Sequence, residues 1–387
     1  MCGWFDQWLK INWRVILLTV VLLAVFDWSL ERLILPYYFN APAGKQQLAV
    51  ENTERGPLIR RLPADDADTL TLWKQQLAGD QSFSVVFLGD SIVHGGGVPG
   101  EDQTIPSYLA YHLNSLRRDE PFQVYSFSLP GCTPTDTLKI LRFIVDTRPD
   151  LVIYDVNVGW FGSPRVMEHP RLAQLGRSSR SGPSPGKPAE KKKPTQYIEG
   201  MIKDFATRHW ALYRHRILLN YLWFGKPIKE KLALQVTQAE EVPPEERLTS
   251  PEEKFKPWYE KDFSALKQAK GKLGSCDLND ANQHLRSYRE IISTLEENGI
   301  RAAFFMIPRN KTMYVRYNLL DEELLQAKQD QLANEARQRG IEVFDYTYAV
   351  DNRYFTDSVH MTAEGNQAVA KYLTWDLVKS GLIQMGE

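Results

Sequence analysis

The sequence predicts an α/β protein in which helices cover both faces of a parallel β-sheet. Short runs of consecutive apolar residues, typical of strands buried on both faces, alternate with longer segments of helical periodicity. The first two of these runs end in glycine-containing turns. With 387 residues, the chain is long enough for one large domain or two ordinary ones.

Five repeats of this alternation make up the predicted sheet. The expected strands are residues 84–91, 122–131, 150–160, 300–308 and 341–347. The expected helices are residues 104–118, 136–148, 285–299, 320–340 and 364–381. Because a helical segment separates each strand from the next, we expect parallel neighbours joined by right-handed crossovers.

Before the sheet, residues 15–26 form an unbroken apolar run, VILLTVVLLAVF. An ideal transmembrane helix needs roughly 20 residues, and the Asp27, Glu31 and Arg32 that follow the run are costly at bilayer depth. We therefore expect one tilted transmembrane helix over about 11–35, with its distal turns among the lipid headgroups. The alternatives are a cleaved signal peptide, which lacks a small-residue site close behind the run, and a buried helix of a soluble protein.

The residues that flank the apolar run predict its orientation. Lys10 and Arg14 precede it, and the positive-inside rule places such residues in the cytoplasm. Trp13 and Trp28 stand at its two ends, where aromatic side chains favour the membrane interface. Residues 1–40 are thus interpreted as a cytoplasmic stub and signal-anchor that crosses the inner or plasma membrane once, with the rest of the chain outside, in the periplasm.

Composition divides the rest of the chain. Residues 41–82 are interpreted as a polar linker and lead-in, and residues 83–387 as the main domain, with an insertion at about 161–284. Residues 177–196 hold six Lys/Arg and one Glu among many Ser, Pro and Gly, which predicts a disordered basic loop. This loop either binds an anionic polymer or headgroup or is a solvated insertion. The aromatic segment 197–227 either packs on the domain, lies on the membrane or holds a partner helix.

Charge and cysteine content exclude two classes of function. The 47 Lys+Arg and 48 Asp+Glu leave a formal charge of −1, which gives no general case for a nucleic-acid partner. Cys2, Cys132 and Cys276 lack the paired spacing of a zinc site, so we expect neither a metal nor another cofactor. In an oxidising compartment Cys132 and Cys276 are either a disulfide or two buried thiols.

Polar residues gather where the predicted strands end. Ser91 follows the first strand in a Gly-Asp-Ser turn, Gly131 follows the second, and Asn157 follows the third. Asp357 and His360 occupy the loop between the fifth strand and the last helix. Since ligands of open parallel sheets bind outside the carboxyl ends of the strands, we expect all five residues to meet at one edge.

These residue types fit nucleophilic catalysis. A serine hydroxyl needs a base to take its proton, and the base needs an acid to orient it. We assign these roles to Ser91, His360 and Asp357. The backbone N–H groups of Ser91 and Gly131 and the side-chain amide of Asn157 are expected to hold the oxyanion. The alternative is structural: Ser91 as a helix N-cap, and Asp357 and His360 as caps of the last helix.

Three other polar residues close to this edge each have two alternative roles. His94 either lines the pocket or is structural, and Arg309 and Asn310 after the fourth strand either contact substrate or belong to a loop. The glycine run at 95–97 lacks the strand-to-helix context and the Lys-Ser/Thr of a phosphate loop, so nucleotide binding is not expected.

Four blocks of the sequence resemble the SGNH (GDSL-type) hydrolase superfamily: FLGDSIVHGGG, YSFSLPGCT, VIYDVNVGW and FTDSVHMTAEGNQAVAKYL, in the family's order. The resemblance covers about residues 83–160 and 285–380. It implies a flavodoxin-like sheet and the hydrolysis or transfer of ester-linked acyl groups without a metal. One departure is that the family's Gly-x-Asn-Asp reads Asp155-Val156-Asn157-Val158 here, which indicates an atypical branch.

An anchor before an external domain of this type also resembles proteins that work beside polytopic membrane-bound O-acyltransferases. The sequence therefore predicts a membrane-anchored serine esterase or O-acyltransferase that acts on acyl groups, most simply acetyl, of a cell-envelope polysaccharide or glycan. Two alternatives stay open. The first is a non-catalytic partner or scaffold for a membrane O-acyltransferase, and the second is an esterase of the lysophospholipase type.

Overall fold

The computed structural model describes residues 13–34, 49–53, 56–62, 67–116, 121–163, 172, 210–214, 251–268 and 271–384. The chain divides into two compact units. The first comprises residues 1–42 and 180–238, and the second comprises residues 43–179 and 239–387. The predicted sheet and the predicted site residues all belong to the second unit.

The second unit is built on a five-stranded, fully parallel sheet. Its strands are β3 (Phe83–Leu88), β4 (Phe122–Ser126), β5 (Leu151–Val156), β6 (Arg301–Met306) and β7 (Glu342–Asp345). They lie in the order β4-β3-β5-β6-β7, which is the flavodoxin-like order 2-1-3-4-5. The predicted α/β class and parallel sheet are therefore confirmed.

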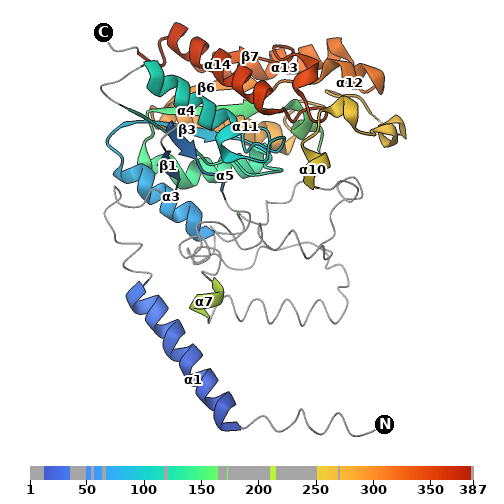
Figure 1. The fold of residues 1–387 in the computed structure, drawn as a ribbon. Coiled ribbons are helices and arrows are strands. Elements are labelled where there is room, and N and C mark those ends of the chain that lie inside the picture. Colours follow the sequence, from blue (N-terminus) through green and yellow to red (C-terminus); the bar gives the residue numbers. More distant parts are fainter. Residues whose placement is uncertain are drawn as a thin grey trace, which may run out of the picture. The chain divides into compact units, whose positions relative to one another are not determined.

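Helices cover both faces of this sheet (Figure 1). The long helices are α3 (Ala67–Gly79), α4 (Ile105–Leu116), α5 (Pro134–Ile144), α11 (Gln283–Glu297), α13 (Glu322–Arg337) and α14 (Ala363–Lys379). Helix α4 packs against α14, while α11 packs against α5 and α13. Shorter helices are α10 (Pro251–Lys254), α12 (Lys311–Arg316), and the 3-10 turns Glu101–Gln103, Val145–Thr147, Val158–Gly162, Trp258–Glu260, Ser264–Gln268 and Asn352–Tyr354.

The strands are shorter than the sequence predicts, and the difference falls mainly at their carboxyl ends. Strand β3 ends at Leu88 instead of position 91, β4 at Ser126 instead of 131, and β5 at Val156 instead of 160. The residues beyond these ends leave the sheet ladder and form turns. Ser91, Gly131 and Asn157 therefore lie in turns after the strands, where the sheet pairing does not fix their direction.

Residues 41–82, interpreted from the sequence as a linker and lead-in, contribute regular structure to the second unit. Strand β1 (Val50–Thr53) pairs antiparallel with β2 (Gly56–Ile59), and α3 follows. The Ile59 N–H donates to the Ser107 hydroxyl of α4 at 3.1 Å, and the buried Trp73 ring packs edge-on against Phe127. Buried apolar residues such as Ile59 and Trp73, which stand among polar ones in the sequence, therefore attach β2 and α3 to the core.

The end of the predicted insertion packs against the loop that precedes α14. The Trp258 backbone N–H donates to the Phe355 carbonyl at 2.9 Å, and its ring N–H donates to the Asn352 carbonyl at 2.8 Å. The predicted basic loop at 177–196 and most of the aromatic segment 197–227 lie outside the described residues.

The first unit contains α1 (Trp13–Ser29), which continues as a π-helical turn (Leu30–Ile34), and α7 (Ala211–Arg214). The Asp27 carboxylate of α1 accepts the Leu212 N–H at 2.7 Å. Apolar side chains such as Val15 and Leu18 are exposed along α1. Within the described ranges, no helix combines the length and the apolar character that crossing a membrane requires.

Cys132 and Cys276 are both free, buried thiols, which decides between the two alternatives that the sequence left open. Each sulfur has a separate packing site. The Cys132 sulfur lies 3.5 Å from the Thr137 hydroxyl, and Cys276 packs against Gly162. Burial raises the pKa of both thiols, which keeps them protonated and unreactive.

Candidate active site

The structure brings Ser91, His360 and Asp357 into one continuous chain of hydrogen bonds. Ser91 Oγ lies 2.8 Å from His360 Nε2, and His360 Nδ1 lies 2.6 Å from Asp357 Oδ2. Ser91 comes from the turn after β3, and the other two come from the loop between β7 and α14. The arrangement is that of a nucleophile, a base and an orienting acid.

A small closed turn presents Asp357 and His360 together. Phe355 and Met361 form an antiparallel bridge at its base, and the Thr356 N–H donates to the His360 carbonyl at 2.8 Å. Within the turn, Asp357 Oδ1 accepts the backbone N–H groups of Val359 and His360 at 2.8 and 2.7 Å. The second oxygen of the carboxylate is therefore directed at the imidazole.

The electrostatics of this pair favour an ionised acid and a more basic imidazole. Burial alone would raise the pKa of Asp357, but the nearby His360 and the hydrogen bonds to the carboxylate outweigh it and lower the pKa to about 2. Burial alone would lower the pKa of His360, but the Asp357 charge outweighs it and raises the pKa above the ordinary histidine value. The acid thus stays charged throughout the physiological range.

The structural alternative for these residues does not match the observed caps. No helix begins at Ser91, because α4 starts at Ile105. Helix α14 has Thr362 as its N-cap residue instead of Asp357 or His360.

The glycine run at 95–97 makes room for the base, a role that the sequence analysis did not assign. An added Cβ at Gly96 would lie 2.7 Å from His360 Cδ2, which is closer than real Cβ contacts allow. A Cβ at Gly97 would clash with the backbone of Met361. Side chains at these two positions would therefore displace the loop that holds the imidazole.

Gly131 lies in a turn that is tied to the nucleophile strand. The Leu129 N–H donates to the Gly89 carbonyl at 3.2 Å, two residues before Ser91. Gly131 has a left-handed backbone with φ of 73°, and nothing lies within 4 Å of where its Cβ would be. Glycine adopts this left-handed backbone without strain, and the space beside its Cα is open.

Asn157 is fixed by contacts on both ends of its amide. Its Nδ2 donates to Asp90 Oδ2 at 2.8 Å, beside the nucleophile. Its Oδ1 accepts the Gly159 N–H at 3.0 Å and Arg309 Nη2 at 2.9 Å. The Trp160 ring N–H also donates to Asp90 Oδ2, at 2.6 Å. The third predicted oxyanion donor thus belongs to a buried polar network behind Ser91.

Asp155 adds a second carboxyl to this network. Burial, followed by the neighbouring Asp90 charge, raises the pKa of Asp155 well above its usual range. The Asp90 N–H lies 3.3 Å from both Asp155 oxygens, and a Cβ at Gly89 would clash with the same carboxyl. Position 155 thus places a carboxyl group directly under the nucleophile turn.

Asn310 and His94 are bound by backbone carbonyls near the site. Asn310 is fully buried, and its Nδ2 donates to the Asp357 carbonyl at 3.3 Å while its N–H donates to the Ser358 carbonyl at 3.0 Å. The His94 Nδ1 lies 3.1 Å from the Ser128 carbonyl oxygen. Asn310 thus holds the loop that carries Asp357.

Among the described residues, no group of His, Cys, Asp and Glu has the arrangement of a metal site.

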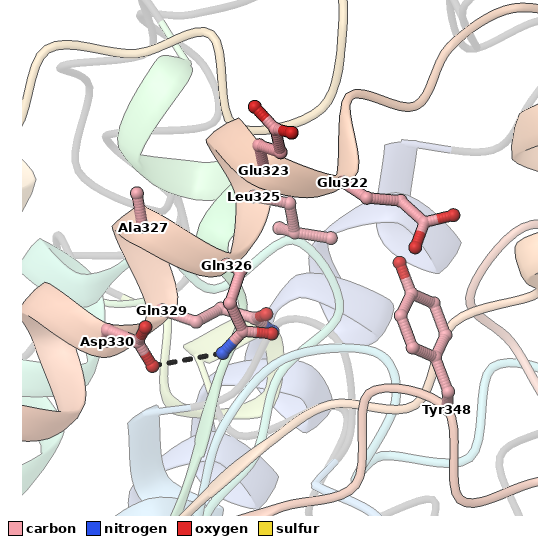
Figure 2. A pocket seen from close by; sticks show the side chains of 8 residues that line it. All are labelled: Glu322, Glu323, Leu325, Gln326, Ala327, Gln329, Asp330 and Tyr348. Atoms are coloured by element: carbon pink, nitrogen blue, oxygen red, sulfur yellow. Dashed lines mark hydrogen bonds between the residues drawn. The ribbon is translucent and has the colours of Figure 1, made fainter.

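A cavity of about 490 Å³ lies elsewhere in the second unit. Figure 2 shows that its lining side chains come from the first turns of α13 and from Tyr348. None of them belongs to the predicted site. Lys311 forms an ion pair with Glu322 at 2.7 Å on this cavity, which offsets part of its acidic charge.

The sheet has the flavodoxin-like strand order, and the contacts among Ser91, His360 and Asp357 lie at its carboxyl edge. Residues 251–374 match the sequence profile of the DltD protein family. That segment includes Asp357 and His360. No curated protein matches the chain.

Several solved structures are similar to the chain at low identity. A putative acylhydrolase from Bacteroides fragilis has 14% identity and a TM-score of 0.39, covering 82% of this chain and 100% of its own. A lipase/acylhydrolase from Enterococcus faecalis has 10% identity and a TM-score of 0.39, covering 79% of this chain and 98% of its own. An acetyl xylan esterase has 12% identity and a TM-score of 0.39, covering 76% and 99%.

Proposed function

We propose that this protein is a serine esterase or O-acyltransferase that acts on ester-linked acyl groups of a cell-envelope polysaccharide or glycan. The observation that carries the proposal is the continuous contact from Ser91 Oγ through the His360 imidazole to the Asp357 carboxylate. Such a chain makes a serine hydroxyl nucleophilic at neutral pH, and no cofactor is needed for acyl transfer by this route.

In the first half of the reaction, Ser91 Oγ attacks the carbonyl carbon of the acyl ester while His360 Nε2 takes the hydroxyl proton. The Asp357 carboxylate stabilises the imidazolium that forms, because its negative charge lies against Nδ1. The tetrahedral intermediate then expels the alcohol, which receives the proton from His360. The product is an acyl-enzyme on Ser91.

The negative oxygen of the intermediate needs donors that are already in place. We assign this role to the backbone N–H groups of Ser91 and Gly131 and to the Asn157 amide. The Asn157 Nδ2 carries two hydrogens, and the bond to Asp90 uses one of them. The second hydrogen is available for the oxyanion. Loss of one such donor typically costs on the order of 100-fold in rate.

In the second half, His360 Nε2 takes a proton from the incoming hydroxyl, whose oxygen bonds to the acyl carbon. The bond between Ser91 Oγ and the acyl group then breaks, and His360 returns the proton to Ser91 Oγ. Water as acceptor gives an esterase, and a sugar hydroxyl gives an acyltransferase. An acetyl group is the simplest acyl substrate that we propose. A polytopic membrane O-acyltransferase is the proposed partner that supplies or receives the acyl group.

The proposal includes a membrane anchor in the N-terminal segment, with the catalytic unit outside the cytoplasm. It is supported by the apolar run at 15–26 and by the exposed apolar side chains of α1, which need a nonaqueous cover. The test is fractionation of cells that express the full chain. A protein that stays in the membrane pellet after carbonate washing fits the anchor, and release into the supernatant contradicts it.

The catalytic proposal is tested by hydrolysis of p-nitrophenyl acetate and by covalent labelling with a fluorophosphonate. Ser91→Ala should abolish labelling, and Ser91→Ala and His360→Ala should each lower turnover by orders of magnitude. Unchanged turnover in either variant would contradict the assigned mechanism. A wild-type protein that neither labels nor turns over would favour a non-catalytic scaffold instead.

A further inference from the structure

Arg309, which follows strand β6, is an arginine placed in an unusual environment. Its side chain is only 2% exposed, so a substrate in the open part of the site does not reach it. Its Nη2 donates to Asn157 Oδ1 at 2.9 Å, and its Nη1 donates to the Tyr314 hydroxyl at 3.1 Å. Its Nε is buried with no hydrogen-bond partner among the described residues.

The guanidinium also lacks an acidic partner. In the described part of the chain, no carboxylate lies within ion-pair distance of Arg309. A buried, incompletely bonded cation is costly, and a hydrophobic side chain of similar size would commonly be as stable or more so. Packing or stability is therefore a poor explanation for this arginine. Its best-formed contact is the one with Asn157.

The side-chain amide of Asn157 has two ends that must not be exchanged. In the observed orientation Oδ1 faces two donors, Gly159 N–H and Arg309 Nη2, while Nδ2 faces the Asp90 carboxylate. Rotation of the amide by 180° would place Nδ2 against the guanidinium and Oδ1 against Asp90. It would also direct an acceptor at the developing oxyanion, where a donor is needed.

We propose that Arg309 is a positioning residue that fixes the side-chain amide of Asn157 as an oxyanion donor and strengthens it. This inference rests on the proposed acyl-transfer function. A cationic donor on Oδ1 draws electron density from the amide, which makes the Nδ2 hydrogens more positive. The Asn157 amide lies between the two charges, because Arg309 donates to its Oδ1 and the Asp90 carboxylate accepts from its Nδ2. The negative charge of Asp90 thus offsets part of the positive charge of the guanidinium.

The test compares four variants of the full-length enzyme with p-nitrophenyl acetate, a neutral substrate. Arg309→Met should lower kcat about tenfold with KM changed by less than about twofold, because a positioned donor that acts in the transition state is weakened. Arg309→Lys should restore part of kcat, since it keeps a cation. Asn157→Ala should lower kcat on the order of 100-fold. The double variant Arg309→Met/Asn157→Ala should be no worse than Asn157→Ala alone.

Two controls separate positioning from folding. Tyr314→Phe removes the second acceptor of Arg309 but leaves the Asn157 contact, so its kcat should stay close to wild type. Arg289→Met removes an arginine of α11 that is ion-paired with Glu335 at 2.8 Å and does not touch the site. It should also leave kcat unchanged. A loss of kcat in Tyr314→Phe equal to that in Arg309→Met would overturn the proposal.

The double-variant comparison is the decisive measurement. If the losses of kcat from Arg309→Met and Asn157→Ala multiply in the double variant, Arg309 does not act through the Asn157 amide. If Arg309→Met raises KM and leaves kcat unchanged, Arg309 acts in substrate binding instead. The second-order rate of fluorophosphonate labelling at Ser91 should follow the same order of variants. A wild type that labels without hydrolysing the ester would reject the acetyl substrate, while the labelling rates still decide the role of Arg309. A wild type that does neither overturns both proposals.

Discussion

The two sides of the candidate site are assembled in different ways. On one side, the base and acid come from a single short turn, in which Asp357 is oriented by backbone N–H groups of its own turn. On the other side, the Asn157 amide contacts Asp90 after β3 and Arg309 after β6, and Trp160 after β5 donates to the same Asp90 carboxylate. The first side depends on local backbone geometry, and the second depends on the packing of the whole sheet.

This difference predicts how substitutions on each side affect catalysis and stability. A change in the acid–base turn should alter catalysis while the fold stays intact, because the turn lies outside the sheet core. A change in the network around Asn157 should alter catalysis and stability together, because Asp90, Asp155 and Arg309 are all at most 2% exposed. The following predictions compare the two sides, from the largest expected effect to the smallest.

The largest effect is expected from Asp357→Asn. The new side-chain amide would donate to His360 Nδ1, which places the imidazole proton on Nε2 and leaves it unable to accept the Ser91 proton. We expect kcat to fall on the order of 10⁴-fold with little change in melting temperature. The residual rate should also rise with pH through a lower midpoint than in the wild type, because the charge that raises the pKa of His360 is gone.

The measurement is the pH–rate profile of both enzymes with p-nitrophenyl acetate, together with their melting curves. A wild-type midpoint above the ordinary histidine pKa is expected, since the imidazole must lose its proton before it can act as a base. Equal midpoints in the two enzymes would contradict the electrostatic role given to Asp357. A large fall in melting temperature would show that this turn is not separate from the core.

A smaller effect on the same side is expected from Gly96→Ala. The added methyl group would meet the imidazole of His360 and push it from Ser91. Since misplacement by about 1 Å can cost on the order of 100-fold, we expect a loss of that size in kcat. Gly162→Ala is the control, because its Cβ would meet only the Cys276 Cβ at 3.3 Å. Similar activity in Gly96→Ala and Gly162→Ala would show that the loop adjusts without cost.

Much of the fold and of the acid–base side could be predicted from the sequence. Continuous apolar runs such as 85–88 are visible because both faces of a parallel strand are buried. The rule that loops at the carboxyl ends of strands share one edge then brings Ser91 and His360 together, although 269 positions separate them. Strand ends were less accurate, because polar turn residues continue the apolar pattern by a few positions.

The amide side could be predicted only in part. Asn157 follows a recognisable strand, but its partner Arg309 lies 152 positions away and its role depends on which side of the loop it faces. The sequence left Arg309 either at the substrate or in a loop, and the structure places it in the loop after β6 with its side chain buried. The sequence excludes the glycine run at 95–97 as a phosphate loop, but it does not reveal that Gly96 and Gly97 lie against the His360 loop. Close approach between distant segments has no signal in a single sequence.

The smallest effect on catalysis, and the clearest on stability, is expected from Asp155→Asn. Because burial and the Asp90 charge favour the protonated form of Asp155, a neutral amide of nearly the same shape should leave kcat at pH 7 within a few fold. Its raised pKa means that the folded protein holds a proton that the unfolded chain releases above about pH 4. Wild-type stability should therefore fall as pH rises above that value, and Asp155→Asn should lack this component. The melting temperature of the variant minus that of the wild type should become more positive from pH 5 to pH 8, and a difference that shrinks over this interval would mean that Asp155 is ionised beneath the nucleophile.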